Sequence, residues 1–231
     1  MKPIIVCFLI LILVGPAAGE DYQPLETGNF WSYVAEGGAE EMRVVVEPVP
    51  IFNGNPYPLE YTISSSNQGL INFWTSESDG GVLLWGFFRQ SWGRLYQPPI
   101  RVVDAPLYVG KTWTSTVDIY ALPDTTFMES VIFTFEVLEN PELTVPAGIF
   151  PTFGISMTSY DMNAILEGSY TPWGESRTNN SRDVDRWYSL DVGVVQDNLD
   201  HLYQLETYTD HPVAIEASSW GAVKALYRGV Q

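Results

Sequence analysis

The chain has 231 residues, with 28 acidic side chains against 11 Lys and Arg, so its formal net charge at pH 7 is −17. A surface this acidic repels phosphate backbones, which excludes binding to nucleic acid by charge neutralisation. Hydrophobic residues make up 45% and aromatic residues 14% of the chain, enough for a substantial core. The length fits one large domain that follows a short leader.

The leader is the first segment of the chain. A charged start at Lys2 precedes an apolar run over residues 3–14 and a small-residue stretch over 15–19. This order is typical of a secretory signal peptide, and the apolar run is shorter than the roughly 20 residues that a membrane-spanning helix needs. We predict a signal peptide over 1–19 and a mature chain that begins at Glu20, is secreted or periplasmic or at the cell surface, and has no transmembrane segment.

Cysteine usage agrees with a simple mature domain. Cys7 is the only cysteine of the sequence, and it lies in the predicted signal peptide. The mature chain therefore needs neither disulfides nor thiolate ligands, although an oxidising compartment would permit disulfides.

Alternating apolar and polar residues dominate the body of the chain, and alternation with period 2 predicts half-buried strands. In 41–47 the pattern places Met42, Val44 and Val46 on the covered face and Arg43 on the other. In 57–64 it places Glu60 on the polar face. The expected strands are 29–34, 41–47, 57–64, 70–75, 82–89, 92–97, 111–120, 127–138, 152–159, 185–195 and 201–208, with a long connection over 98–110.

These strands predict an all-β, mainly antiparallel fold in a single domain over 20–210. About ten or eleven strands suit a large curved sheet, an open barrel or a sandwich. The tail over 211–231 differs, because Pro212 ends the strand pattern and helical spacing begins at Trp220. We predict a linker and a short C-terminal helix there.

The run from Val82 to Phe88 is apolar on both faces. It is either a central strand covered on both sides or the wall of a ligand cavity. Convergent aromatics with few polar groups are typical of small-molecule sites, and core packing is the alternative. The aromatic residues around this run are our predicted binding residues for a lipid-like or glycan ligand: Trp74, Trp85, Phe87, Phe88, Trp92 and Tyr96.

Two further motifs carry architectural signals. The first, Val145–Phe153, reads as strand, Pro146-Ala147-Gly148 turn, strand. The second, Trp187–Val195, reads as two short strands hinged at Gly193. We predict that Gly148 and Gly193 adopt backbone conformations that other residues resist. The structural positions of the two motifs are Pro146, Gly148, Phe153, Trp187, Tyr188 and Gly193.

The two motifs, Val-Pro-Ala-Gly-x-Phe-x-x-Phe and Trp-Tyr-Ser-x-x-Val-Gly-Val-Val, together resemble those of a widespread family of secreted bacterial proteins of unknown function. The likeness runs from about Tyr22 to Tyr208. It departs at Leu190-Asp191, where that family has Pro-Gly, and at Gln196, where it has Lys. The resemblance implies a curved antiparallel β fold, similar to the half-barrel lipoprotein carriers of the bacterial envelope, and supplies no catalytic residues.

Catalytic motifs are missing from the sequence. It has no Gly-x-Ser-x-Gly elbow, no His-Glu-x-x-His and no phosphate-binding glycine loop. We therefore assign no catalytic residue, no metal site and no cofactor. The leading hypothesis is a secreted non-enzymatic β-protein that binds or carries an apolar small molecule or an envelope partner. The alternatives are a surface-assembly protein that docks through its C-terminal tail, and a secreted hydrolase.

Overall fold

The computed structural model describes residues 20–35, 37–52, 55–64, 70–89, 92–161, 183–198 and 202–209. The predicted signal peptide over 1–19 and the predicted tail helix over 211–231 lie outside these residues. No helix among the described residues has the length and apolar character needed to cross a membrane.

Every regular element of the described chain is a strand, which confirms the all-β class. The strands are β1 (Phe30–Ala35), β2 (Glu40–Phe52), β3 (Asn55–Ser64), β4 (Leu70–Ser76), β5 (Val82–Arg89), β6 (Trp92–Val103), β7 (Thr112–Leu122), β8 (Phe127–Glu139), β9 (Glu142–Val145), β10 (Gly148–Pro151), β11 (Phe153–Asp161), β12 (Arg186–Ser189), β13 (Gly193–Asp197) and β14 (Tyr203–Thr209).

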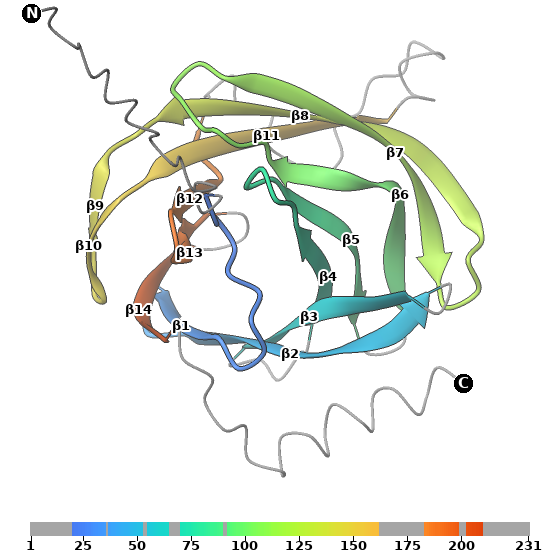
Figure 1. Ribbon diagram of the computed structural model, residues 1–231, viewed down its shortest axis with the longest axis horizontal. Coiled ribbons are helices and arrows are strands. Elements are labelled where there is room, and N and C mark those ends of the chain that lie inside the picture. The colour runs from blue at the N-terminus through green and yellow to red at the C-terminus, as the bar shows by residue number, and fades with distance from the viewer. Residues whose placement is uncertain are drawn as a thin grey trace, which may run out of the picture.

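Twelve of these strands form one large curved antiparallel sheet, as Figure 1 shows. The pairing runs in order from β2 to β8, continues through β11, β12, β13 and β14, and reaches β1, which also pairs with β2. The two edges of the sheet therefore meet, and the sheet closes as a barrel. The remaining strands, β9 and β10, form a separate hairpin.

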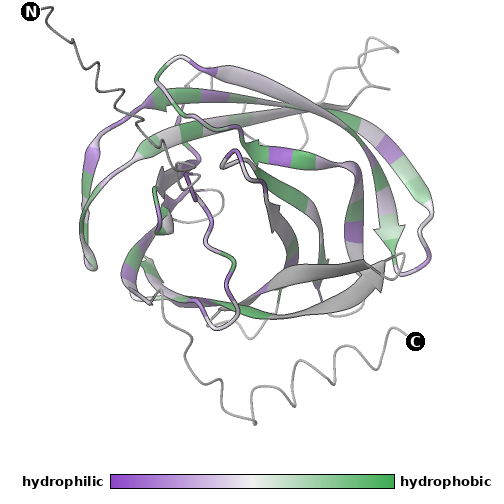
Figure 2. Cartoon of the chain, in the orientation of Figure 1, coloured by the Kyte–Doolittle hydropathy of each residue, from purple (hydrophilic) through white to green (hydrophobic). Residues whose placement is uncertain are grey.

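The regular alternation of β7 and β8 explains why this part of the sheet forms. Val117 and Ile119 of β7, and Val131, Phe133 and Val137 of β8, are buried, and the residues between them are more exposed. This period-2 pattern puts the apolar side chains on the face that turns into the barrel. Figure 2 shows the resulting alternation of hydrophobic and hydrophilic residues along these strands.

The expected connection over 98–110 is wrong in its first part, because β6 continues to Val103. Pro98 and Pro99 fall where the register with β5 jumps from Leu95 to Ile100, and past Gln97 β6 no longer pairs with β7. Prolines are tolerated there because no ladder hydrogen bond needs their missing N–H.

The predicted Pro-Ala-Gly turn joins β9 to β10. The hairpin packs against β14 through a hydrogen bond from Ala147 N to Leu205 O and an edge-to-face contact of Phe150 with Tyr208. Gly148 has φ of 144° and Gly193 has φ of 93°, which confirms that both glycines have positive φ. Asp191, in the turn before Gly193, has φ of 59°.

Candidate functional site

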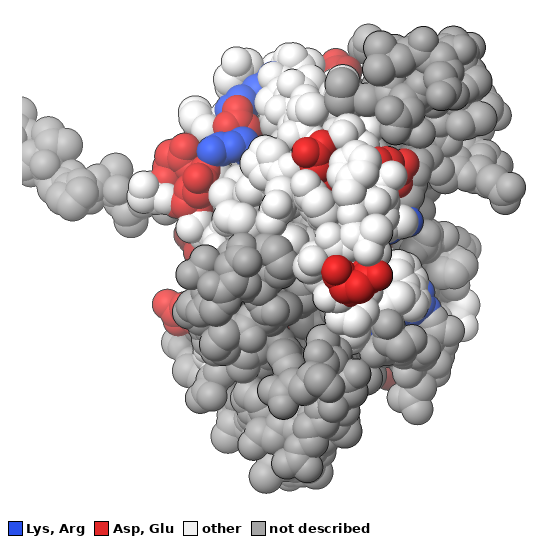
Figure 3. Space-filling model, turned by 90° about the vertical axis from the view of Figure 1, so that its right-hand side faces the viewer, with Lys and Arg blue, Asp and Glu red and all other residues white. Residues whose placement is uncertain are grey.

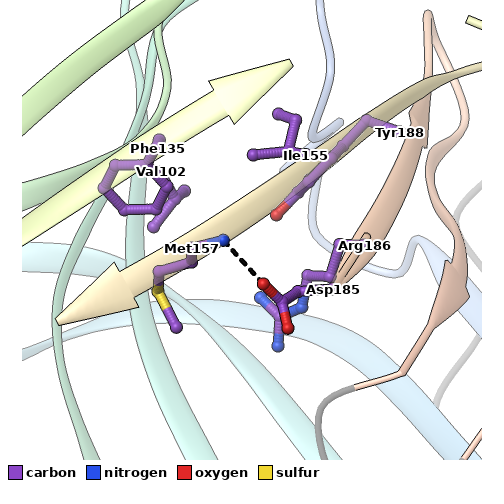
Figure 4. Close-up of a pocket in the computed structure, with 7 residues that line it drawn as sticks. All are labelled: Val102, Phe135, Ile155, Met157, Asp185, Arg186 and Tyr188. Carbon is purple, nitrogen blue, oxygen red and sulfur yellow. Dashed lines mark hydrogen bonds between the residues drawn. The ribbon is translucent and has the colours of Figure 1, made fainter. Parts of the chain in front are cut away.

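The barrel interior holds a pocket between four strands. Figure 4 shows apolar side chains from β6, β8 and β11 facing Tyr188 of β12, with Asp185 and Arg186 to one side. The apolar lining consists of Val102, Phe135, Ile155 and Met157. A largely apolar wall with a few polar groups at one side suits an apolar molecule.

The free space in this pocket is small. Its volume of about 30 Å³ has room for one or two water molecules. Pockets that bury a whole small molecule are roughly ten times larger. The pocket in this conformation therefore admits a narrow group, such as the end of an acyl chain, unless a side chain moves.

Asp185, on the polar side of the pocket, is held in place by hydrogen bonds to two neighbouring segments. Its Oδ2 accepts a hydrogen bond from Met157 N at 2.6 Å, its own N donates to Ile155 O, and its carbonyl accepts from Asn198 N. The residue thereby joins β11 to the segment that follows β13. These contacts give the carboxylate a structural role.

A buried ionic network lies beside the pocket. Arg43 and Arg186 both bind the same oxygen, Asp197 Oδ2, each at 3.0 Å. Arg43 also pairs with Glu41 at 2.6 Å and lies over the ring of Tyr33, 4.6 Å from its centroid. Since buried charges are costly unless paired, one carboxylate here holds two arginines in place.

The electrostatics of the network keep both arginines charged. Burial acts to lower the pKa of Arg43, but Tyr33, Glu41 and Asp197 outweigh it and raise that pKa above its ordinary value. The pKa of Arg186 is also raised, because Asp197 and Tyr188 outweigh its burial. Burial raises the pKa of Tyr33 and of Tyr188, so both phenols remain protonated.

A second buried carboxylate holds the segment Glu20–Asn29, which we call the strap. Glu60, only 2% exposed, accepts hydrogen bonds from Gln23 Nε2 at 2.8 Å and from Asn72 Nδ2 at 3.1 Å. The strap is also fixed to β4 through Ser76 Oγ, which donates to Gln23 O, and to the β12–β13 turn through Asp191 N, which donates to Asp21 O. It thus crosses one end of the barrel.

The structure corrects the predicted faces of two strands. Arg43 is buried, whereas Met42, expected on the covered face, is 37% exposed. Glu60, expected on a polar face, is buried as well. Both predictions are wrong for the same reason: the barrel interior accepts charged side chains that find partners there, and a hydropathy pattern reads every charge as exposed.

The six predicted binding residues do not share one environment. Trp74 and Tyr96 are buried in the interior cluster, and Phe87 packs against that cluster. Trp92 is exposed and meets Phe87 edge-to-face at 5.4 Å. Trp85 donates from Nε1 to Thr75 Oγ1 at 2.9 Å, and Phe88 is buried outside the interior cluster. None of the six lines the pocket of Figure 4.

Sequence reasoning missed the network of Arg43, Arg186 and Asp197, and the strap that Glu60 holds. Their contacts join residues far apart in the chain, such as Arg43 and Asp197, which are separated by 154 positions. The one available signal was that Arg43 and Glu60 lie within strands and next to apolar residues, Val44 and Leu59.

No family model matches the chain, and no curated protein matches it. Among solved structures, it is similar to a "putative lipoprotein" from Parabacteroides distasonis at 14% identity and TM-score 0.42, covering 83% of this chain and 99% of that one. It is also similar to a "putative exported protein with YmcC-like fold" from Bacteroides fragilis at 12% identity and TM-score 0.42, covering 84% and 100%. A likeness this loose carries no argument about function.

Proposed function

We propose that this chain is an exported, non-enzymatic binding protein of the bacterial envelope that takes an apolar molecule into the interior of its barrel. The observation that carries the proposal is the pocket formed by Val102, Phe135, Ile155 and Met157. Export is supported by the charged start, apolar run and small-residue stretch of residues 1–19.

The size of the pocket limits the ligand. With a volume of about 30 Å³, it fits the end of an unbranched chain better than a ring system. Met157 is the side chain best able to enlarge it, because methionine has three rotatable bonds and adapts to irregular space. The ligand is therefore a narrow apolar group that enters beside Met157.

The charged groups at the pocket favour binding over hydrolysis. Asp185 accepts from a backbone amide, and Arg186 pairs with Asp197. A general acid or base has to reach a substrate proton, and these groups are already committed to holding strands together. Acidic side chains predominate among the charged groups on the face shown in Figure 3, which also favours an uncharged ligand.

The test is native mass spectrometry of protein purified from its own host. We expect the unaltered chain to retain an apolar molecule. Met157→Trp fills the pocket and should release it, whereas Met42→Trp, at an exposed position, should not. The absence of any retained molecule, or equal retention by the two variants, would contradict the proposal.

Surface assembly is the second candidate, and one observation favours it. Large apolar side chains are exposed at the β5–β6 and β7–β8 turns, namely Trp92 at 47%, Phe127 at 51% and Met128 at 46%. Exposed aromatics at neighbouring turns can serve as a contact surface. Replacing all three with Ser should abolish surface retention without changing the retained ligand, if this second function is correct.

A further inference from the structure

One face of β4 lies along the strap. Alternation along a strand places Asn72, Trp74 and Ser76 on this face. Asn72 binds Glu60, which also binds Gln23, and Ser76 binds the Gln23 carbonyl. Trp74 therefore lies between Asn72, which shares the Glu60 carboxylate with Gln23, and Ser76, which donates to the Gln23 carbonyl.

The indole nitrogen of Trp74, unlike the side chains of Asn72 and Ser76, makes no hydrogen bond within the described chain. This Nε1 is a buried donor, and the side chain is only 5% exposed. Buried polar groups are almost always satisfied, since an unmet donor costs stability, so an isolated one requires an explanation. A second unmet polar atom, Asn29 Oδ1, lies at the end of the strap.

We infer that Trp74 Nε1 is the hydrogen-bond donor for an uncharged oxygen of the ligand, and that the strap is the plug that the ligand displaces. The inference rests on the proposed function, narrows its ligand class, and extends the binding site from the Met157 pocket to Trp74, which does not line that pocket. The ligand is an apolar chain that carries an ester or another neutral carbonyl, whose oxygen accepts the hydrogen bond from the indole.

The position of Glu60 indicates that the ligand oxygen bound by Trp74 is uncharged. Its buried carboxylate is held by Gln23 and by Asn72, two positions from Trp74 on the same strand. The nearby Arg43 already pairs with Glu41 and Asp197 as well as interacting with Glu60. A second carboxylate brought to Trp74 would therefore add a negative charge with no free cation in the described interior to offset it. A carbonyl oxygen offers the same acceptor without that added charge.

The strap has the contacts of a removable plug. Side-chain and backbone hydrogen bonds of Asp21 and Gln23 attach it to Glu60, Ser76 and Asp191. Tyr22 adds an edge-to-face contact with Phe153, 6.3 Å between ring centroids. Gly28 and Asn29 exchange two backbone hydrogen bonds with Val45 and anchor the strap to β2, whereas residues 20–25 are held by the side chains of Tyr22, Gln23 and Leu25 and have no strand ladder. Residues 20–25 are therefore the part of the strap that can leave while the barrel stays folded.

Three matched probes test the inference: methyl decanoate, which has a neutral acceptor; decanoate, which has a charged one; and undecane, which has none. We expect the ester to bind roughly 2- to 10-fold more tightly than undecane, which is the value of one hydrogen bond, and decanoate to bind more weakly than the ester. In the unaltered protein, the ester should shift the Trp74 indole N–H resonance, and undecane should shift it less.

Two variants complete the test. Trp74→Phe should remove the preference for the ester over undecane, while Trp113→Phe, whose indole already donates to Arg101 O at 2.8 Å, should keep it. Gln23→Ala should increase the association rate of all bound probes. The resonance measurement needs no variant, so it decides the matter even if Trp74→Phe folds poorly.

The outcomes separate this inference from the proposed function. If the ester and undecane bind equally and the Trp74 resonance does not move, the donor role is overturned while the binding function stands. If Gln23→Ala leaves association rates unchanged, the plug role is overturned. If none of the probes binds the unaltered protein, both proposals fail.

Discussion

Two walls of the barrel are built by different means. The long-strand wall consists of β6, β7 and β8, with 12, 11 and 13 residues. The short-strand wall consists of β12, β13, β14 and β1, with 4, 5, 7 and 6 residues. Along the first wall β7 and β8 pair from Thr112 to Tyr120, whereas in the second β13 and β14 pair at only two positions.

Side chains make up for the short ladders of the second wall. Trp31 Nε1 donates to Val192 O at 2.6 Å, and Tyr33 Oη donates to Val194 O at 2.9 Å. Asp197 adds its two arginines, and the β9–β10 hairpin packs on β14. Long strands therefore gain stability through many equivalent backbone hydrogen bonds, whereas a wall of short strands depends on a few specific side-chain bonds.

The largest effect is expected from Asp197→Ala. The substitution leaves Arg43 and Arg186 without their shared carboxylate inside the barrel. Removing one partner of a buried ion pair costs about 3–5 kcal/mol of unfolding free energy, measured by urea denaturation. Glu77→Ala, which breaks a more exposed pair with Arg101, should cost under about 1 kcal/mol. Equal losses would remove the distinction between buried and exposed pairs.

The second largest effect is expected from raising the pH, because the protein loses stability when buried tyrosines in both walls deprotonate. Burial raises the pKa of Tyr96 in the long-strand wall from 10.0 to about 12, and raises that of Tyr33 and Tyr188 in the short-strand wall. Because the folded form holds its proton more tightly, stability is full below pH 10 and falls between about pH 10 and 12, by roughly 3 kcal/mol for Tyr96. Absorbance of tyrosinate should rise together with unfolding, and Tyr96→Phe should reduce the loss.

Gly193→Val should cost about 1–3 kcal/mol, because φ of 93° strains any residue with a Cβ. The added Cβ would also lie 3.4 Å from Gln23 Oε1, against the strap. Gly110→Val is the control, since its φ is also positive at 86° but nothing lies within 4 Å of its Cβ. Thermal unfolding should show a larger loss at Gly193, and a larger loss at Gly110 would refute the contact with the strap.

The smallest loss of stability is expected when a single indole hydrogen bond is removed, and one such bond in each wall can be compared. Trp31→Phe removes the bond to Val192 O, and Trp113→Phe removes the bond to Arg101 O at 2.8 Å. We expect about 1 kcal/mol for the buried Trp31 and less for the half-buried Trp113. If the order reverses in urea denaturation, the short-strand wall does not depend on its side-chain bonds in the way proposed.

In the long-strand wall, the sequence predicted β7 and β8 well but ended β6 at residue 97 instead of Val103. Alternation over 111–120 and 127–138 located β7 and β8 nearly to their ends, because those strands bury one face each and follow period 2. The turn glycines Gly148 and Gly193 were also predictable, since Pro and Gly specify turns locally.

The interior site was harder to predict than the strands of the short-strand wall, since β1, β14 and the two pieces hinged at Gly193 were expected close to their observed bounds. β13 is buried at four of its five positions, so its prediction depended on the glycine at its start and not on alternation. Arg43 and Glu60 are buried through contacts with distant residues, and no local pattern contains those contacts. The pocket around Met157 depends on how four strands curve together, which is a property of the closed sheet.

The ladder between β1 and β14 has a consequence for the order of events during folding. It joins segments that are far apart in the chain, as the hydrogen bond from Ser32 Oγ to Glu206 Oε2 across 174 positions shows. Closing so long a loop is slow, and until it closes one edge of β1 and one edge of β14 remain open and can pair with other chains. We therefore expect the ladders from β1 to β8, which join neighbours in sequence, to form first, and the outer edge of β1 to stay open to other chains until β14 is available.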